Sequence, residues 1–122
     1  MITVHVVCGT CGLNTVIRAF RIHRKHVGIA INSVCDKVMA LEGPLRKLNI
    51  TKVVKTPFNK NIVYKEAGKH SLHAACSLPC GVVEAAEVEM GMTSVKDASI
   101  ILRTNEWGLS DALQSTNDSC AG

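Results

Sequence analysis

Residues 13–31, LNTVIRAFRIHRKHVGIAI, decide the fold of this chain. In residues 13–22, apolar side chains return at roughly every second position, and residues 27–31 form a second apolar run. Both runs are typical of β-strands. The polar residues 23–26 (HRKH) between them are short enough for a turn. We therefore predict an antiparallel hairpin.

The residues before and after the hairpin extend this pattern. Residues 2–7 (ITVHVV) alternate like a half-buried strand and lead into a glycine-containing turn, CGTCG, at residues 8–12. After the hairpin, Ser33 is a candidate N-cap for a helix. The apolar face of that helix is Val34, Val38, Leu41 and Leu45, and we expect Pro44 after Gly43 to kink or end it.

The second half of the chain predicts a longer helix. Residues 51–68 read as a connecting segment with a short helix near residues 62–67. The clearest helix spans residues 73–91, with Ser77 as a natural N-cap, Pro79 and Cys80 in the first turn, and Gly91 at the end. Residues 99–102 (SIIL) are candidates for one last strand.

These elements predict an α+β fold, in which a small antiparallel sheet of three to four strands carries helices on one face. We expect a single metal-binding domain over residues 1–103. Residues 104–122 are rich in serine, asparagine and aspartate, so we expect a mobile tail there.

Composition limits the function classes. Only 3% of the 122 residues are aromatic, too few to stack nucleic-acid bases, so nucleic-acid binding is not expected. The net charge is +4. A basic face could dock an acidic protein partner, although solvated strands and loops explain the same residues. These are Arg18, Arg21, Arg24, Lys25, Lys52, Lys55, Lys60, Lys65 and Lys69. Without a signal peptide or an apolar run of about 18 residues, we expect a cytoplasmic protein outside the membrane.

Six cysteines are many for a chain of this length. In a reducing compartment, thiols or metal thiolates are favoured over disulfides. Cys11 lies in the glycine turn, Cys35 at the exit of the hairpin, and Cys76 and Cys80 beside the start of the long helix. Because side chains from distant segments meet at such element ends, these four cysteines are the predicted metal ligands.

Thiolates favour iron–sulfur clusters, zinc and Cu(I), and a helix N-terminus stabilises a thiolate. His73, three residues before Cys76, is a candidate ligand or a donor to a ligand, and we assign it to cofactor binding. Buried cysteines that act as small apolar side chains are the alternative to a metal site. Cys8 could complete the site, pair with Cys11 or enter the core, and we expect Cys120 to be uninvolved.

At these residues the sequence resembles the iron–sulfur cluster assembly scaffold family. The likeness rests on Cys11-Gly12 after a strand, a strand pair leading to Cys35, and His73 and Cys76 before a helix. It implies an α+β fold with helices on one side of a small antiparallel sheet. It also implies a cluster, or zinc, on Cys11, Cys35 and Cys76, with His73 nearby.

The sequence departs from that family at four places. Leu13 and Asn14 follow the Cys-Gly pair where the family has an aspartate that eases cluster release, so a retained cluster is implied. Ala74 and Ala75 separate the histidine from its cysteine. Val34 replaces a glycine, and Cys80 is an additional thiol that would complete four ligands.

A closer resemblance is to a family of small cysteine-rich proteins of anaerobic prokaryotes whose activity is not characterised. Roughly residues 4–102 share its pattern: a Cys-Gly turn, the Ser33-Val34-Cys35 junction, and HAACSLPC at residues 73–80. This resemblance supports the site and implies no activity.

The sequence leaves several functions open. The first is a protein that holds an iron–sulfur cluster as scaffold, carrier or electron-transfer module. The second is structural zinc on four thiolates. A third is a thiol enzyme with Cys76 as nucleophile and His73 beside it, which we rank lower because no third orienting residue is evident. The oligomeric state stays open.

Overall fold

The computed structural model of the chain describes residues 1–8, 12 and 14–104. Within them, β1 (Ile2–Val7), β2 (Asn14–His23), β3 (His26–Ser33) and β4 (Lys47–Asn49) form one sheet in that order. Every neighbouring pair is antiparallel. The predicted hairpin is confirmed as β2 and β3, which pair from Thr15–Ser33 to His23–His26.

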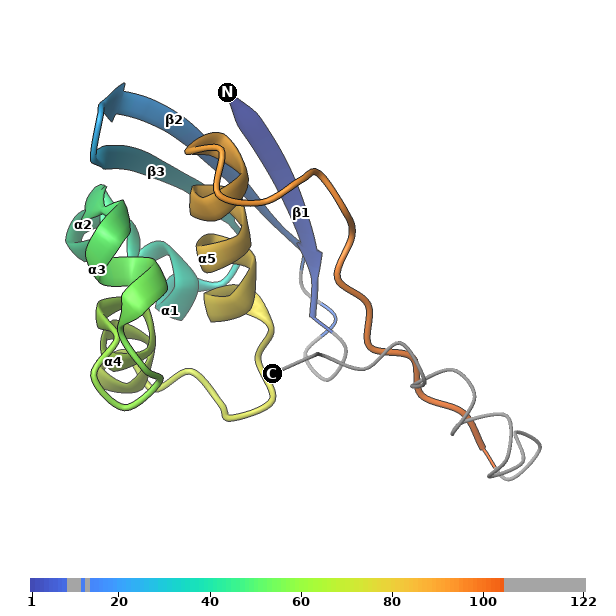
Figure 1. Cartoon of the computed structure of the whole chain (residues 1–122). Coiled ribbons are helices and arrows are strands. Elements are labelled where there is room, and N and C mark those ends of the chain that lie inside the picture. The colour runs from blue at the N-terminus through green and yellow to red at the C-terminus, as the bar shows by residue number, and fades with distance from the viewer. Residues whose placement is uncertain (9–11, 13, 105–122) are drawn as a thin grey trace.

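Helices pack against this sheet, as Figure 1 shows, and the α+β class is thereby confirmed. They are α1 (Asp36–Met39), α2 (Glu42–Leu45), α3 (Ile50–Lys55), α4 (Ile62–Lys69) and α5 (Leu78–Glu89). Helix α5 lies across β1, β2 and β3, while α1 and α2 contact β3. Helix α4 confirms the short helix predicted near residues 62–67.

Alternation along the strands produces the core. Val6, Ile17, Ala19, Ile29 and Ile31 are buried under the helices, whereas residues between them, such as His5 and Arg18, are exposed. Helix α5 contributes the side chains that pack against these strand residues. They are fully buried, and they are Leu78, Val82, Ala85 and Ala86.

The helix predicted after Ser33 is shorter and broken. Ser33 ends β3, Cys35 occupies the N-cap position of α1, and a second helix, α2, follows. The break lies at Ala40 and Leu41, whereas Pro44 is the third residue of α2, in a first turn where a missing amide hydrogen costs little. A helix that continued through the break would join the amide of Leu41 to the carbonyl of Lys37. The amide of Leu41 bonds instead to the carbonyl of Val38, at 3.0 Å.

The strand predicted at residues 99–102 is wrong. This segment is neither strand nor helix, and every residue from 91 to 104 is exposed. The fourth strand is β4, which pairs with β3 through Val27–Leu48 at the far edge of the sheet. Of the tail predicted at residues 104–122, only Thr104 lies within the described residues.

The ends of α5 follow the capping signals, although the helix begins at Leu78 and not at residue 73. Ser77 is at the N-cap position and Pro79 lies in the first turn, although the serine hydroxyl makes no capping bond. Gly91 has a φ of +75°. The amides of Gly91 and Met92 donate to the carbonyls of Val88 and Glu87, at 3.1 and 2.8 Å. This glycine-terminated pattern confirms the predicted helix end.

None of the helices in the described part of the chain has the length and apolar character that crossing a membrane requires.

Replacing Gly81 with alanine should lower the free energy of unfolding by about 1–3 kcal/mol. Gly81 is buried where α5 meets the sheet, and an added Cβ would stand 2.6 Å from Cγ2 of Val6 and 3.3 Å from Cδ1 of Ile17. Urea denaturation followed by circular dichroism measures the change. The matched control is Gly68→Ala in α4, where the new Cβ has no described atom within 4 Å other than those of its chain neighbours and of its own helix backbone. Because alanine favours a helix, the control should gain roughly 0.5–1 kcal/mol.

Candidate metal centre

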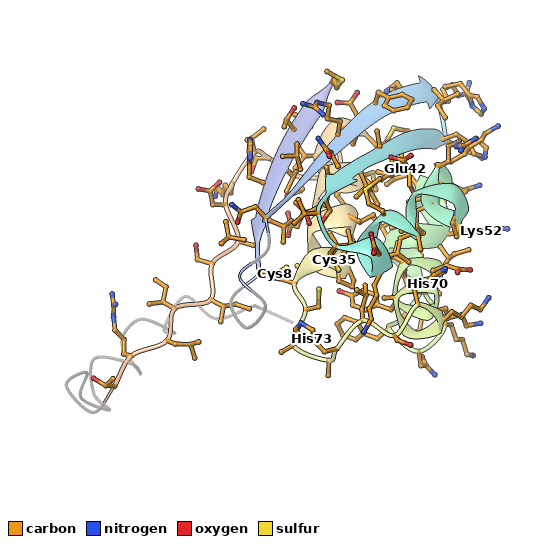
Figure 2. All side chains as sticks on the ribbon, turned by 180° about the vertical axis from the view of Figure 1, so that it is seen from behind. Cys8, Cys35, Glu42, Lys52, His70 and His73 are labelled. Atoms are coloured by element: carbon orange, nitrogen blue, oxygen red, sulfur yellow. The ribbon has the colours of Figure 1, made fainter. Side chains whose placement is uncertain are left out.

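A cavity of about 410 Å³ lies at the end of the sheet where β1 and β3 stop and the chain approaches α5. Cys8, Cys35, Cys76 and His73 line it, together with the charged residues Asp36 and Lys37. Figure 2 shows Cys8, Cys35 and His73 at this same end of the molecule. Three cysteines and one histidine from three separate segments therefore share one cavity.

The register of the sheet brings the first two segments together. Strands β1 and β3 are both antiparallel to β2, so they run in the same direction and finish at the same end of the sheet. Thr15 of β2 pairs with Val6 on one side and Ser33 on the other. Cys8 is two residues after Val6, and Cys35 is two residues after Ser33, so both cysteines lie at the same end of the sheet.

Cys8 is placed by the alternation of β1. It has the same parity as the buried Val6, and its side chain is only 3% exposed. Its carbonyl accepts a hydrogen bond from the amide of Gly12 at 2.9 Å, and Gly12 has a φ of +67° that favours glycine. The sequence left the role of Cys8 open. Its parity with Val6 is the signal that would have placed it on the helix-covered face.

Cys35 is held by a short chain of hydrogen bonds. The hydroxyl of Thr15, which is buried, donates to the hydroxyl oxygen of Ser33 at 2.8 Å. That oxygen also accepts from the amide of Cys35 at 3.1 Å. The carbonyl of Cys35 accepts a hydrogen bond from the amide of Met39, and this is the first backbone bond of α1. Ser33 therefore acts as the acceptor that orients the Cys35 backbone, while Cys35 itself takes the N-cap position.

Cys76 and His73 lie in the connection between α4 and α5. Ser71 there adopts a left-handed conformation with a φ of 59°, and the amide of Leu72 donates to the carbonyl of Ala67 at 3.1 Å. A turn follows, in which the amide of Cys76 donates to the carbonyl of His73 at 3.0 Å. Cys76 is half-buried and His73 is exposed at the cavity.

Cys80, the fourth predicted ligand, does not line this cavity. It is an exposed residue of α5, and Glu84 and Glu87 follow it at helical spacing. Desolvation of its sulfur, followed by the negative charges of Glu84 and Glu87, raises the pKa of the Cys80 thiol. The pKa of Tyr64 is raised as well, by desolvation and then by Cys80. The surroundings of Cys80 thus differ from those of Cys35 and Cys76.

Cys11 lies outside the described residues, as does Cys120, so the predicted role of Cys11 stays a prediction. Cys35, Cys76 and Cys80 form no disulfide. Within residues 1–8, 12 and 14–104, no three histidine, cysteine or carboxylate side chains are close enough to hold one metal ion. The described thiols share a cavity without forming a compact single-ion site.

The donors at the cavity determine its chemistry. Sulfur and imidazole suit zinc, Cu(I) and iron–sulfur clusters, whereas calcium and magnesium need several oxygen ligands. Asp36 is the one carboxylate among the described lining residues, and Lys37 opposes its charge. By type, these donors would suit a soft metal or a cluster better than calcium or magnesium.

Replacing Ser33 with alanine should lower the free energy of unfolding by about 1–3 kcal/mol, because the buried Thr15 hydroxyl and the Cys35 amide both lose an acceptor. Adding Thr15→Val removes the unsatisfied hydroxyl. The double variant should therefore lose less stability than the sum of the two single variants. Urea denaturation of the reduced, metal-free protein measures all three. Additive losses would contradict the coupling of Thr15 and Ser33.

Alkylation should reveal the raised pKa of Cys80. Only the thiolate reacts, so a raised pKa slows alkylation at a fixed pH. Replacing Glu84 with glutamine removes a negative charge and lowers that pKa, so iodoacetamide at pH 8 should label Cys80 about two- to threefold faster. Peptide mass spectrometry gives the rate. Glu89→Gln, on the same helix, is the control and should leave the Cys80 rate unchanged.

Comparison with known proteins gives a family. No curated protein and no solved structure matches the chain. The model of one family does match, and it covers residues 2–102, which include the whole sheet, all described helices and the cavity. The chain is therefore a member of a family of unknown function, DUF6951.

Proposed function

We propose that this protein binds an iron–sulfur cluster in the cavity, with Cys8, Cys35 and Cys76 as ligands and Cys11 as the fourth. The observation that supports this proposal is the convergence of three cysteines and His73 on one cavity from separate segments. Cysteines that serve only as small apolar side chains need no common cavity, because any position in the core satisfies them.

The size of the cavity favours a cluster over a single zinc ion. Zinc holds sulfur at about 2.3 Å in a tetrahedron, which brings its sulfur ligands to within about 4 Å of one another. The described side chains form no such group, and the cavity measures about 410 Å³. Iron and sulfide atoms lie between the thiolates of a cluster, so its ligands stand further apart. A cavity of this volume, lined by three cysteines, leaves room for this second arrangement.

The residues around the cavity have definite tasks in this proposal. Cys8 and Cys76 supply thiolates from partly or fully buried positions, which limits the access of water. Lys37 provides a positive charge beside an anionic group. His73 can donate a hydrogen bond to a ligand or to the bound group. When bound, an iron–sulfur cluster supplies one-electron transfer or serves as cargo for another protein.

The resemblance to the iron–sulfur scaffold family supports the same region, since it implies ligands at Cys11, Cys35 and Cys76. Leu13 and Asn14 replace the aspartate that eases release in that family. We therefore favour a retained cluster, as in a carrier or an electron-transfer protein, over a scaffold that transfers it quickly. A thiolate site of this kind needs a reducing compartment, so we propose a cytoplasmic location.

Purification without oxygen, followed by reconstitution with iron and sulfide, tests the proposal. We expect a brown protein with charge-transfer absorption in the visible and with iron and acid-labile sulfide bound in similar amounts. Single Cys8→Ser, Cys35→Ser and Cys76→Ser variants should each lose most of this absorption. Far-UV circular dichroism of each variant separates the loss of a ligand from the loss of the fold.

Cys80→Ser is the matched control, because it removes a thiol that does not line the cavity and is four residues from a proposed ligand. It should keep the absorption. Loss of the cluster in Cys80→Ser, with Cys8→Ser unaffected, would instead support the ligand set predicted from the sequence. A colourless protein that holds zinc, or no metal after anaerobic reconstitution, would overturn the cluster proposal.

A further inference from the structure

Strand β1 is an edge strand, and its outer side is not paired with any described strand. Strand β1 is first in the strand order, so it pairs with β2 on one side and with no described strand on the other. Its sequence, ITVHVV, contains no lysine, proline or acidic residue. Proteins commonly use such residues to prevent an edge strand from pairing. The backbone of this edge is therefore suited to accept another strand.

The core is also open on this side. Ile2 and Val4 face the helices, like Val6, but both are only half-buried. Their partners on β2, Ala19 and Ile17, are 0% exposed. A further strand beyond β1, with apolar residues at alternate positions, would cover Ile2 and Val4 and complete the layer.

Residues 99–102 (SIIL) have the composition of such a strand. The side chains of Ile100 and Leu102 are 86% and 88% exposed, and in an extended strand they would lie on the same face. Isoleucine favours strands, and none of the four residues carries a charge. This segment therefore has exposed apolar side chains that could cover Ile2 and Val4, and β1 has an unpaired backbone with which the segment could form a strand pair.

The end of α5 brings the segment to the correct side of the sheet. Glu89, the last residue of α5, lies 3.3 Å from the amino group of Met1, beside the start of β1. From there the chain runs past β1 and away from the body of the molecule, as the orange and red trace of Figure 1 shows. The apolar segment thus extends outward, where another molecule can meet it.

We propose that residues 99–102 of one copy of this chain pair with the outer edge of β1 in a second copy, and the reverse. This exchange gives a two-fold dimer in which Ile100 and Leu102 pack beside Ile2 and Val4 of the partner.

The direction of the chain favours pairing with a second copy over pairing with the same chain's β1. The chain that leaves α5 runs past its own β1 in the direction of that strand, so residues 99–102 would pair in parallel if they lay against it. A second copy can approach antiparallel, like every other pair in the sheet, and antiparallel pairing is slightly more stable.

Sedimentation velocity on the full chain under reducing conditions tests this proposal, which does not depend on a bound cluster. We expect a dimer that dissociates to monomer on dilution. The Ile100→Glu/Leu102→Glu double variant should weaken dimerisation at least tenfold. Because both side chains are exposed, the far-UV circular dichroism and the thermal midpoint of the monomer should not change. Met92→Glu/Val95→Glu, two equivalent changes at exposed positions outside the pairing segment, should keep the dimer.

Four outcomes would overturn the proposal. They are a monomer at all concentrations, a dimer that the Ile100→Glu/Leu102→Glu variant does not weaken, a control variant that weakens it equally, and pairing within one chain. Hydrogen exchange measured by mass spectrometry identifies the last outcome. It would appear as slow exchange at residues 99–102 that does not diminish on dilution to monomer.

Discussion

The register of β1, β2 and β3 is the constraint on which the cavity depends. Val6, Thr15 and Ser33 form one row across the three strands, and the two outer strands leave that row in the same direction. A shift of one residue between β1 and β2 would turn every side chain of β1 to the opposite face. Cys8 would then leave the core face and Val7, now 70% exposed, would replace it. The burial of Val6 against α5 therefore also fixes one wall of the candidate site.

The parts of the fold that the sequence predicted correctly have local signals. Alternation and a polar turn identify the β2–β3 hairpin, and Gly91 identifies the end of α5. Two errors have non-local causes. Strand β4 has only three residues, too few to show a period, and it exists because Leu48 pairs opposite Val27. The apolar segment 99–102 has strand-forming residues but no partner among the described residues, and a strand cannot form without one.

The candidate site was predictable in part, and the reasons differ for each cysteine. Cys35 and Cys76 lie at element ends, as expected, and both line the cavity. Cys80 was predicted to be a ligand because it also lies beside the start of the long helix. Helical spacing, however, groups Cys80 with Glu84 and Glu87, whereas Leu78, Val82 and Ala85 face the sheet. The cavity itself was not predictable, because its shape depends on the left-handed Ser71 and on contacts between distant segments.

Two polar residues are buried among the described residues, and each fixes a junction. Asn61 donates to the carbonyls of Val53 and Thr56 and accepts from the amide of Val63, so it joins α3 to α4. Thr15 donates to Ser33, which orients the backbone of Cys35. Burying a hydroxyl costs free energy unless it is bonded. Among the described residues, the partner of the Thr15 hydroxyl is Ser33, in the junction that carries a cavity cysteine. Cys35 is therefore held against the packed core by hydrogen bonds, and the proposed cluster would need its ligands to be positioned in this way before it binds.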